Sequence, residues 1–481
     1  MLPNPHTEQK AVKLFLLACT ILLVVFSFLS EGTYESGDSI QHFLISKYSF
    51  QHPELFLHHW GKPLFTILSA PLAQFGFVGI NIFNIACAIA TAWFCYLIAV
   101  QLKLANAFLV PLFSLCAPIY FVSIISGLTE MLFAFLLVVS IYFVIKQRPN
   151  TSAILVSFLP FVRSEGFLLI PIFAIYFVFH KKWKSLFLLP LGTLLFSLAG
   201  FLYHYHDIFW ILNSNPYKGA ADIYGSGTLT HFISKNEFIF GTPQVVLIVA
   251  GVVSMFFLSF KQVVTSPIYN HHRLIYACFL VYFIAHSVFW WKGIHSSLGL
   301  IRVIAGVTPL LSLAALQGFN FIITPLSFLK KRGVERGFYY LLLFVVICTT
   351  LWMPFKQHNF PKQLNYEDQV VKQAADWFKK TELIHARSYY IHPYWSYFTN
   401  KDPFDATQNI WSVRENDFLQ KIKVGELFIW DSHYSPAEGH FRLQVLLESK
   451  QFEQVNYFNS GNAPRPKDKE LFELYVFKRV E

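Results

Sequence analysis

Long apolar segments alternate with short polar ones along most of the chain. Between residues 14 and 355, about eleven segments approach the roughly 17 to 22 residues that a helix needs to cross a hydrocarbon core. They lie near residues 14–30, 79–101, 106–123, 128–145, 151–162, 166–180, 185–203, 243–260, 274–291, 303–323 and 338–355. The pattern predicts an α-helical polytopic membrane protein with about 11 transmembrane helices.

After residue 355 the pattern changes, because charged residues become frequent and no apolar segment is long enough to span a bilayer. Helical periodicity over residues 367–380 and 440–448, with strand-like runs at 426–430 and 471–478, predicts a small α/β module. We therefore expect two domains, a transmembrane domain over residues 1–355 and a soluble α/β domain over residues 356–481.

Composition supports this class of protein. Hydrophobic residues make up 54% of the chain and charged residues 14%, whereas soluble domains carry about a quarter charged residues. All six cysteines lie in apolar stretches, so the sequence indicates neither a disulfide framework nor zinc spacing. Lys10 and Lys13 precede the first apolar run as in a signal sequence, but no small-residue cleavage site follows, and we interpret the run as a retained helix.

The loops differ in charge. The N-terminus and alternate loops hold about twice as many basic residues as the other loops. The richer set is Lys10, Lys13, Lys103, Lys146, Arg148, Lys181, Lys182, Lys184, Lys261, Arg273, Lys330, Lys331, Arg332 and Arg336, and the poorer set is Lys47, Lys62, Arg163, Lys218, Lys235, Lys292 and Arg302. Basic loops stay in the cytoplasm. The N-terminus is therefore expected inside, and an odd number of spans places the tail from Lys356 outside.

The unusual polar residues fall in the outward loops, where we expect the chemistry. The first of these loops begins with Glu35 and Asp38 directly after the first span. Asp38 followed by Gln41 and an apolar stripe is typical of a helix cap, with the helix starting at Ser39. The alternative is a general base at that helix start, a role compatible with capping because a carboxylate has several acceptor sites.

Charged residues recur at later outward turns. Lys62 follows His59 and leads into apolar sequence, which fits anion binding or a cation that snorkels to lipid headgroups. Glu130 begins a span and suits the first turn of a helix. Arg163 and Glu165 are expensive at membrane depth, about 2.5–3.5 kcal/mol each, so they either line a cavity or pair with one another.

The remaining candidates lie in two later outward segments. Residues 204–242 form a long loop, typical of a lid or binding element, although a passive cover is equally open. This loop contains Tyr217, Lys218, Tyr224 and His231. The next turn contains Lys292 and Arg302, and Arg302 needs an anionic partner because it lies just inside a span.

The order of these motifs resembles the GT-C superfamily of membrane glycosyltransferases, which includes protein O-mannosyltransferases, aminoarabinose transferases and glycolipid mannosyltransferases. The resemblance covers residues 1 to about 355. Its motifs are Glu35 and Asp38; Lys62, Pro63 and Leu64; Thr129 and Glu130; Arg163, Glu165 and Gly166; and Gly299, Arg302 and Pro309. Many relatives have adjacent carboxylates or an acid-x-acid spacing in the first motif, whereas here two residues intervene.

The resemblance implies a GT-C-like fold and an inverting, mannosyltransferase-like hexosyltransferase that takes its sugar from a polyprenyl-phosphate donor on the extracytoplasmic face. Its acceptor is a hydroxyl of a glycan, lipid or protein. The implied site has Asp38 as general base with Glu35 as auxiliary carboxylate, Lys62, Arg163, Arg302 and Lys292 for the donor phosphate, and His42, His59, Glu130, Glu165, Tyr217, Lys218, Tyr224 and His231 for substrate. We expect a location in a bacterial inner membrane, with the site and the C-terminal domain facing the periplasm. No cofactor is required, a divalent metal is compatible but not indicated, and no nucleic-acid partner is expected.

Two other classes of protein remain open. A transporter or flippase of lipid-linked sugars also needs many spans and intramembrane charges. The sequence has no pair of matching halves, however, and its polar residues crowd one face. A non-catalytic scaffold for polysaccharide assembly is the third reading, because a sequence does not reveal loss of activity.

The predicted topology can be tested with reporter fusions. A reporter fused after Gly439 should show an extracytoplasmic location. The basic loops are expected in the cytoplasm, which places the C-terminal domain on the opposite face. A matched fusion after Lys184, in a basic loop, should report the cytoplasm. Cytoplasmic activity of the Gly439 fusion would contradict the orientation and would move the outward loops to the other face.

Overall fold

A computed structural model describes residues 5–214, 216, 225–261, 267–295, 297–324, 334–411, 421–461 and 471–481. The chain forms two compact units, one of residues 1–28 and 56–360 and the other of residues 29–55 and 361–481. We call them the membrane unit and the C-terminal unit. The segment 29–55, which contains Glu35 and Asp38, therefore packs with the C-terminal residues, a grouping that sequence order does not reveal.

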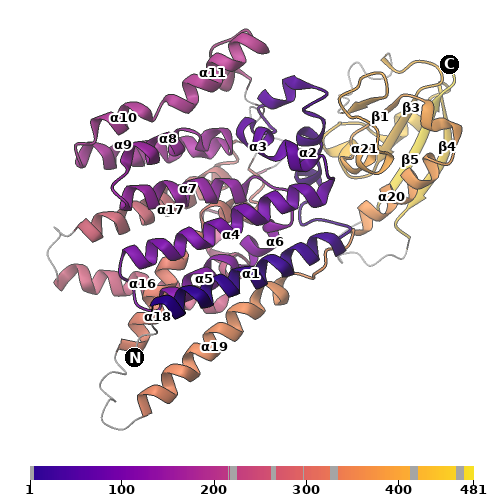
Figure 1. The fold of residues 1–481 in the computed structure, drawn as a ribbon. Coiled ribbons are helices and arrows are strands. Elements are labelled where there is room, and N and C mark those ends of the chain that lie inside the picture. The colour runs from indigo at the N-terminus through magenta and orange to yellow at the C-terminus, as the bar shows by residue number, and fades with distance from the viewer. Residues whose placement is uncertain are drawn as a thin grey trace. The chain divides into compact units, whose positions relative to one another are not determined.

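The membrane unit is helical (Figure 1). Its elements are α1 (Pro5–Leu29), α3 (Pro63–Ala73), α4 (Phe77–Gln101), η2 (Ala107–Leu109), α5 (Val110–Leu115), α6 (Pro118–Ile124), α7 (Glu130–Ile145), α8 (Pro149–Ser157), η3 (Leu159–Phe161), η4 (Ser164–Leu168), α9 (Ile170–Phe179), α10 (Trp183–Leu188), α11 (Leu191–Tyr203), α12 (Trp210–Asn213), α14 (His231–Ser234), α15 (Asn236–Phe240), α16 (Thr242–Lys261), α17 (Pro267–Lys292), η5 (Ile301–Gly306), η6 (Thr308–Leu311), α18 (Ser312–Ile323) and α19 (Val334–Gln357). The short helix η1 (Pro53–Leu57) lies where the chain passes between the units.

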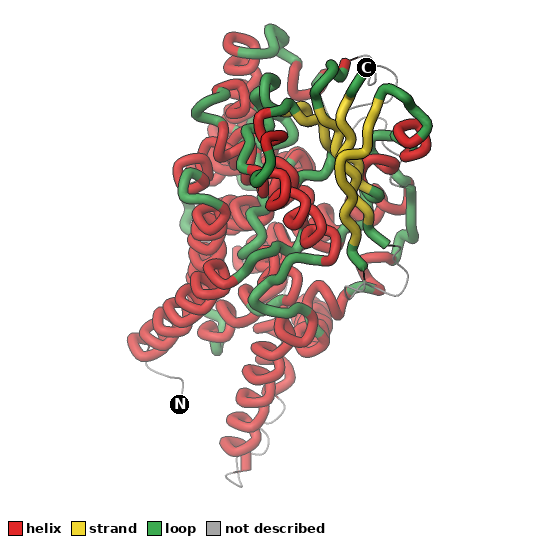
Figure 2. Tube along the Cα trace, turned by 90° about the vertical axis from the view of Figure 1, so that its right-hand side faces the viewer, coloured by secondary structure: helices red, strands yellow, loops and turns green. Residues whose placement is uncertain are grey.

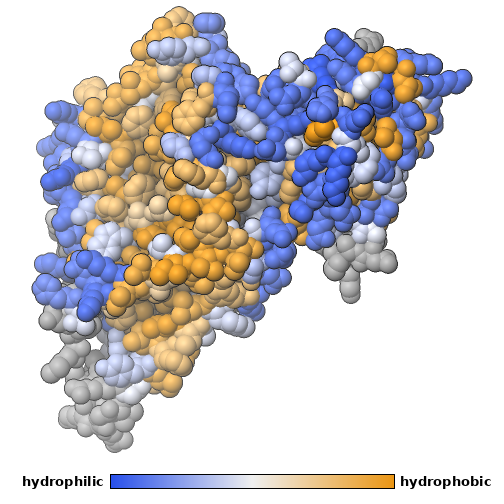
Figure 3. Space-filling model, turned by 45° about the vertical axis from the view of Figure 1, so that its right-hand side comes forward, coloured by the Kyte–Doolittle hydropathy of each residue, from blue (hydrophilic) through white to orange (hydrophobic). Residues whose placement is uncertain are grey.

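Within the described residues, five helices are long and apolar enough to cross a membrane, or six if one bent pair is a single span. Several other segments expected to be spans form shorter apolar helices, such as Glu130–Ile145 and Thr308–Ile323. The polytopic helical class is confirmed, and the count of about 11 spans stays a prediction. Apolar side chains dominate the visible surface of these helices (Figure 3), as expected for contact with lipid.

One expected span is broken. Residues 106–123 form α5 and α6, which meet at an angle of 68°. Pro118 disfavours a helical conformation at the residue before it, and Ala117 is accordingly extended with ψ 124°. The expected span over residues 106–123 therefore contains a bend at Pro118, and its crossing of the membrane as one span stays a prediction.

Close helix packing in this unit uses small residues. A Cβ atom on Gly251 of α16 would collide with the backbone oxygen of Ala314, and one on Gly318 of α18 would collide with that of Leu247. The two backbones can approach only because both positions are glycine. This is the usual way in which membrane helices associate, since the lipid supplies little hydrophobic drive for their contact.

The C-terminal unit contains a five-stranded sheet in the order β2-β1-β3-β5-β4, seen as the yellow strands of Figure 2. Its elements are α2 (Ser36–Tyr48), α20 (Tyr366–Phe378), η8 (Glu382–His385), β1 (Ser388–Tyr390), α21 (Tyr394–Thr399), β2 (Asn409–Trp411), β3 (Leu427–Asp431), α23 (Tyr434–Ala437), α24 (Leu443–Leu447), β4 (Phe452–Asn459) and β5 (Glu473–Arg479). Strand β1 is parallel to β2 and β3, whereas β5 is antiparallel to β3 and β4.

The α/β character expected for the tail is confirmed. The predicted helices correspond to α20 and α24, and the predicted strands to β3 and β5. Phe428 and Phe477 are among the buried core residues that pack on one face of the sheet. Strands β1, β2 and β4 were missed, because β1 and β2 are only three residues long and β4 alternates poorly, with a bulge at Gln454 and Asn456.

Candidate functional site

A buried carboxylate joins two distant arginines in the membrane unit. Glu130, the first residue of α7, is fully buried. Its Oε1 forms an ion pair with Arg163 Nη1 at 2.6 Å and accepts a hydrogen bond from Arg302 Nη1 at 3.0 Å. Buried charges are tolerated only when paired. Glu130 thus brings the two guanidinium groups together from turns that are far apart in the sequence.

A second carboxylate extends this network. Arg163 Nη2 donates to Glu165 Oε1 at 2.9 Å, and His286 Nε2 of α17 lies 3.4 Å from the same oxygen. Arg163 Nη1 also donates to Thr129 Oγ1 at 3.3 Å. The predicted pairing of Arg163 with Glu165 is therefore confirmed, but it is one part of a larger network rather than an isolated pair.

Lys62 joins the same region from another turn. It is only 6% exposed, and its Nζ donates to Ser164 Oγ at 3.0 Å. Ser164 lies between Arg163 and Glu165 in the sequence. Snorkelling to headgroups, the alternative reading of Lys62, does not fit this burial. Its φ of +66° is unusual for a residue with a side chain, and such conformations concentrate at functional sites.

We call Lys62, Arg163 and Arg302, with the carboxylates Glu130 and Glu165, the cationic cluster. Three basic side chains and two carboxylates are thus gathered in one region of the membrane unit, together with the polar side chains of Thr129, Ser164 and His286. Lys62 also directly precedes α3, and Glu130 begins α7, where helix dipoles favour anions. The cluster can therefore accept an anionic group such as a phosphate.

Three other predicted residues of the membrane unit have structural contacts. His59 Nε2 lies 3.0 Å from Ile211 O, and its ring meets Trp210 edge to face. His231 Nε2 lies 2.8 Å from Gly299 O. Lys292 Nζ lies 3.7 Å from the centre of the Trp291 ring, a cation–π contact. Tyr217, Lys218 and Tyr224 lie outside the described residues.

The contact of His231 bears on Arg302. Gly299 has a φ of +65°, and a Cβ atom there would lie 2.7 Å from the Trp290 ring. Gly299 therefore forms the turn that precedes Arg302. The Trp290 ring packs against this glycine, and His231 contacts the Gly299 carbonyl oxygen. His231, which we expect to bind substrate, contacts the backbone of the turn that precedes Arg302.

Glu35 and Asp38 lie at the start of α2 in the C-terminal unit. The helix begins at Ser36 with Glu35 at the N-cap position, and Asp38 lies in its first turn. The reading of Asp38 as the cap of a helix starting at Ser39 was therefore wrong. Both carboxylates are partly exposed, whereas His42 is buried. Asp38 is thus placed on a rigid element with access to solvent.

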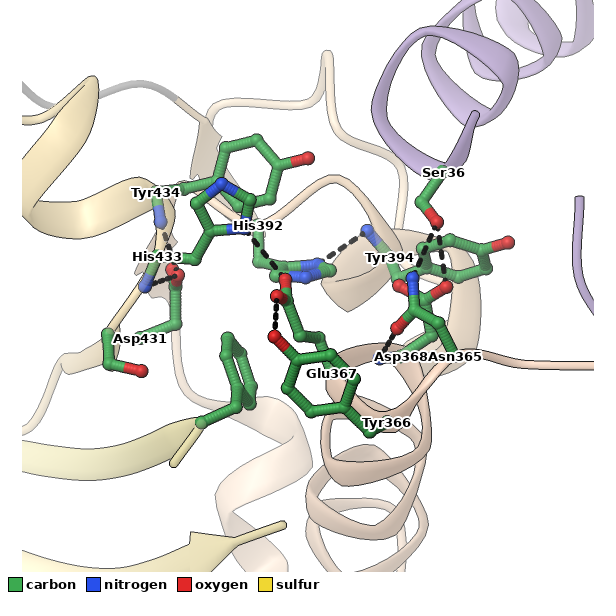
Figure 4. Close-up of polar contacts among 12 residues, drawn as sticks. Ser36, Asn365, Tyr366, Glu367, Asp368, His392, Tyr394, Asp431, His433 and Tyr434 are labelled. Atoms are coloured by element: carbon green, nitrogen blue, oxygen red, sulfur yellow. Dashed lines mark hydrogen bonds and ion pairs between the residues drawn. The ribbon is translucent and has the colours of Figure 1, made fainter. Parts of the chain in front are cut away.

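A polar cluster lies beside the start of α2 (Figure 4). Ser36 Oγ donates to Asp368 Oδ2 at 2.8 Å, and Asn365 Nδ2 donates to Ser36 Oγ at 3.1 Å. Burial raises the pKa of the Asp368 carboxyl to about 7. Burial opposes ionisation of Glu367 as well, but its hydrogen bond with His433, 2.7 Å long, leaves the pKa of Glu367 below its ordinary value.

Sequence reasoning missed several members of these clusters. His286 is a buried histidine inside an apolar span, and an intramembrane ionisable residue is a signal of a site in itself. Ser164 and Thr129 gave no such signal, because serine and threonine are common at turns. Asp368 looked like an ordinary first-turn acid of the predicted helix 367–380, and nothing in the sequence linked it to Ser36.

No family model matches the sequence, and no curated protein matches it. Among solved structures, the chain is similar to ArnT from Cupriavidus metallidurans bound to undecaprenyl phosphate, with 10% identity and a TM-score of 0.58, covering 96% of this chain and 97% of that one. It is also similar to the same protein in the apo state, with 10% identity and a TM-score of 0.59, covering 97% of each chain. At this identity the likeness shows the fold alone, so this chain shares the fold of that protein over nearly its whole length.

The central role of Glu130 can be tested by stability. Glu130→Gln keeps the shape of the side chain but removes the negative charge that faces both buried guanidinium groups, of which Arg163 keeps Glu165 as a partner, and we expect a loss of about 3–5 kcal/mol. Thermal unfolding of the purified protein in detergent should show it. The matched control is Glu237→Gln, because Glu237 pairs with Lys356 at the surface and such pairs contribute about 0–1 kcal/mol. Equal, small changes in both variants would contradict the role of Glu130.

Proposed function

We propose that this protein is a membrane glycosyltransferase that transfers a sugar from a polyprenyl-phosphate donor to an acceptor hydroxyl. The observation that supports the proposal most strongly is the cationic cluster, in which Lys62, Arg163 and Arg302 converge from three separate turns. Its fold is also that of a protein whose structure was determined with undecaprenyl phosphate bound. A lipid phosphate provides the anion that this cluster favours.

The chemistry of a lipid-phosphate head fits these residues. Arginine presents a planar fork of donors that matches phosphate oxygens, and lysine adds a compact charge. Glu130 and Glu165 hold the guanidinium groups in place through their ion pairs with Arg163, and both also belong to the proposed substrate site. The apolar surface of the surrounding helices suits the long hydrocarbon chain of such a donor.

Asp38 is the proposed general base. As the acceptor oxygen attacks the anomeric carbon, its proton passes to the Asp38 carboxylate and the bond from that carbon to the phosphate oxygen breaks. The lipid phosphate leaves with the bonding electron pair, and the cationic cluster stabilises its charge. Direct displacement inverts the anomeric carbon. Glu35 orients the acceptor, and the scheme needs no metal ion or other cofactor.

The proposal includes the membrane face, the number of spans, the sugar and the acceptor. We place the reaction on the extracytoplasmic face of a bacterial inner membrane, with about 11 spans and the C-terminal unit on that face. The sugar is a hexose of the mannosyl type, and the acceptor is a glycan, lipid or protein. Lys292 adds a fourth cation for the donor phosphate, and His42, His59 and His231 support the substrate site.

Arg302→Ala should weaken binding of undecaprenyl phosphate well beyond tenfold, because one of the two guanidinium groups held by Glu130 is lost. Native mass spectrometry or titration of the purified protein measures this affinity. Arg302→Lys keeps the charge but not the fork, and we expect an intermediate loss. Lys235→Ala removes an exposed cation outside the cluster and is the control. Wild-type affinity in a well-folded Arg302→Ala variant would remove Arg302 from the site.

Asp38→Asn should lower the transfer rate by about 10²–10⁴, the usual contribution of a general base, while donor binding stays intact. Asparagine keeps the size and the hydrogen-bonding oxygen of the side chain, so a structural role alone predicts little change. Glu35→Gln should cost only about tenfold, as for an orienting hydrogen bond. Near wild-type transfer by Asp38→Asn would defeat the base assignment, and equal losses at both positions would point to a paired-carboxylate or metal site.

A further inference from the structure

Helix α2 is anchored to the rest of the C-terminal unit at both ends. At its start, Ser36 Oγ donates to Asp368 Oδ2 at 2.8 Å and accepts from Asn365 Nδ2 at 3.1 Å. Near its end, Lys47 Nζ donates to Asn400 Oδ1 at 3.2 Å. These contacts join residues that are more than 300 positions apart in the sequence. The helix is therefore a part of this unit, although the chain enters it directly from the first membrane helix.

The anchor at the start of α2 is the more unusual of the two. The Asp368 side chain is 2% exposed, its Oδ2 accepts from Ser36, and its Oδ1 has no hydrogen-bond partner among the described residues. A buried carboxylate with one unpaired oxygen is costly. A simple apolar or amide contact would hold two helices together at less cost, so the arrangement calls for a role beyond packing.

The surroundings of Asp368 fix the first turn of α2. Asn365 caps α20 by accepting from the Asp368 backbone N–H at 2.8 Å, and its amide reaches across to Ser36. The next residue, Gly37, lies so close to Tyr434 that a Cβ atom would be 3.0 Å from the phenolic oxygen. Asp38 follows directly in the first turn of α2. The hydrogen bonds of Ser36 and the close approach of Tyr434 to Gly37 thus fix the two residues that precede Asp38.

We propose that Asp368 is a positioning residue that acts through Ser36 to fix the first turn of α2, and with it the Asp38 carboxylate. This inference rests on the proposed function, since it assumes that Asp38 is the base. A base must lie within hydrogen-bond reach of the acceptor proton, and a displacement of about 1 Å costs on the order of 10² in rate. The C-terminal unit therefore contributes to catalysis by holding the base, without touching substrate through Asp368.

The test uses the full-length protein and two readouts. Hydrogen exchange of the α2 amides reports the anchor, and steady-state transfer reports kcat and the KM for donor. Ser36→Ala and Asp368→Ala should each speed exchange in the first turn of α2 by about tenfold or more. They should also lower kcat by on the order of 10² with the donor KM unchanged. Asp368→Asn keeps a carbonyl oxygen for Ser36 and should recover kcat to within about tenfold of wild type.

Asp376→Ala is the matched control. Asp376 lies on the same helix α20, but its side chain is 42% exposed and pairs only with Lys372 and Lys379 in the described residues. Exchange in α2 that is the same in Asp368→Ala, Ser36→Ala and this control would overturn the anchor, whatever the transfer rate. Faster exchange together with a fully active Asp38→Asn variant would overturn the proposed base, and the positioning role with it. Ser36→Ala keeps the test decisive if Asp368→Ala fails to fold.

Discussion

The membrane unit depends on the pairing of one buried carboxylate with two guanidinium groups. Glu130 is fully buried at the start of α7, and both Arg163 and Arg302 form ion pairs with its Oε1. An ion removed from water loses several kcal/mol of solvation unless it finds a partner. The pairing brings the residues at the starts of η4, η5 and α7 together in the interior of the membrane unit.

The same charged groups have a structural role in this pairing and a chemical role in the proposed function. Two carboxylates neutralise most of the charge on Lys62, Arg163 and Arg302, which makes their burial tolerable. The same three cations are the groups that the proposed function assigns to the donor phosphate. Thr129, Ser164 and His286 fix the orientation of the charged groups. A site prepared in this way loses little free energy in reorganisation when a charged ligand binds.

The C-terminal unit holds α2, a short helix that directly follows the first membrane helix in the sequence. Residues 29–55 pack with residues 361–481. The contacts of α2 with Asp368 and Asn400 join residues that are 332 and 353 positions apart in the sequence. A loop of that size closes at an entropic cost that grows only slowly with length. The polar and aromatic contacts of α2, including Phe43 against Tyr397, offset that cost.

The sequence alone determined the class of fold and the membership of much of the site. Apolar segment lengths predicted a helical membrane protein, periodicity predicted α20, β3 and β5, and the cost of charges in lipid singled out Arg163 and Glu165. Only the tertiary structure shows which of these residues contact one another. It gave Glu130 two partners, moved the start of α2 to Ser36, and linked Ser36 to Asp368. The reason is physical: burial and helix formation are properties of local sequence, whereas the pairing of distant charges depends on how the chain packs, which no local pattern encodes.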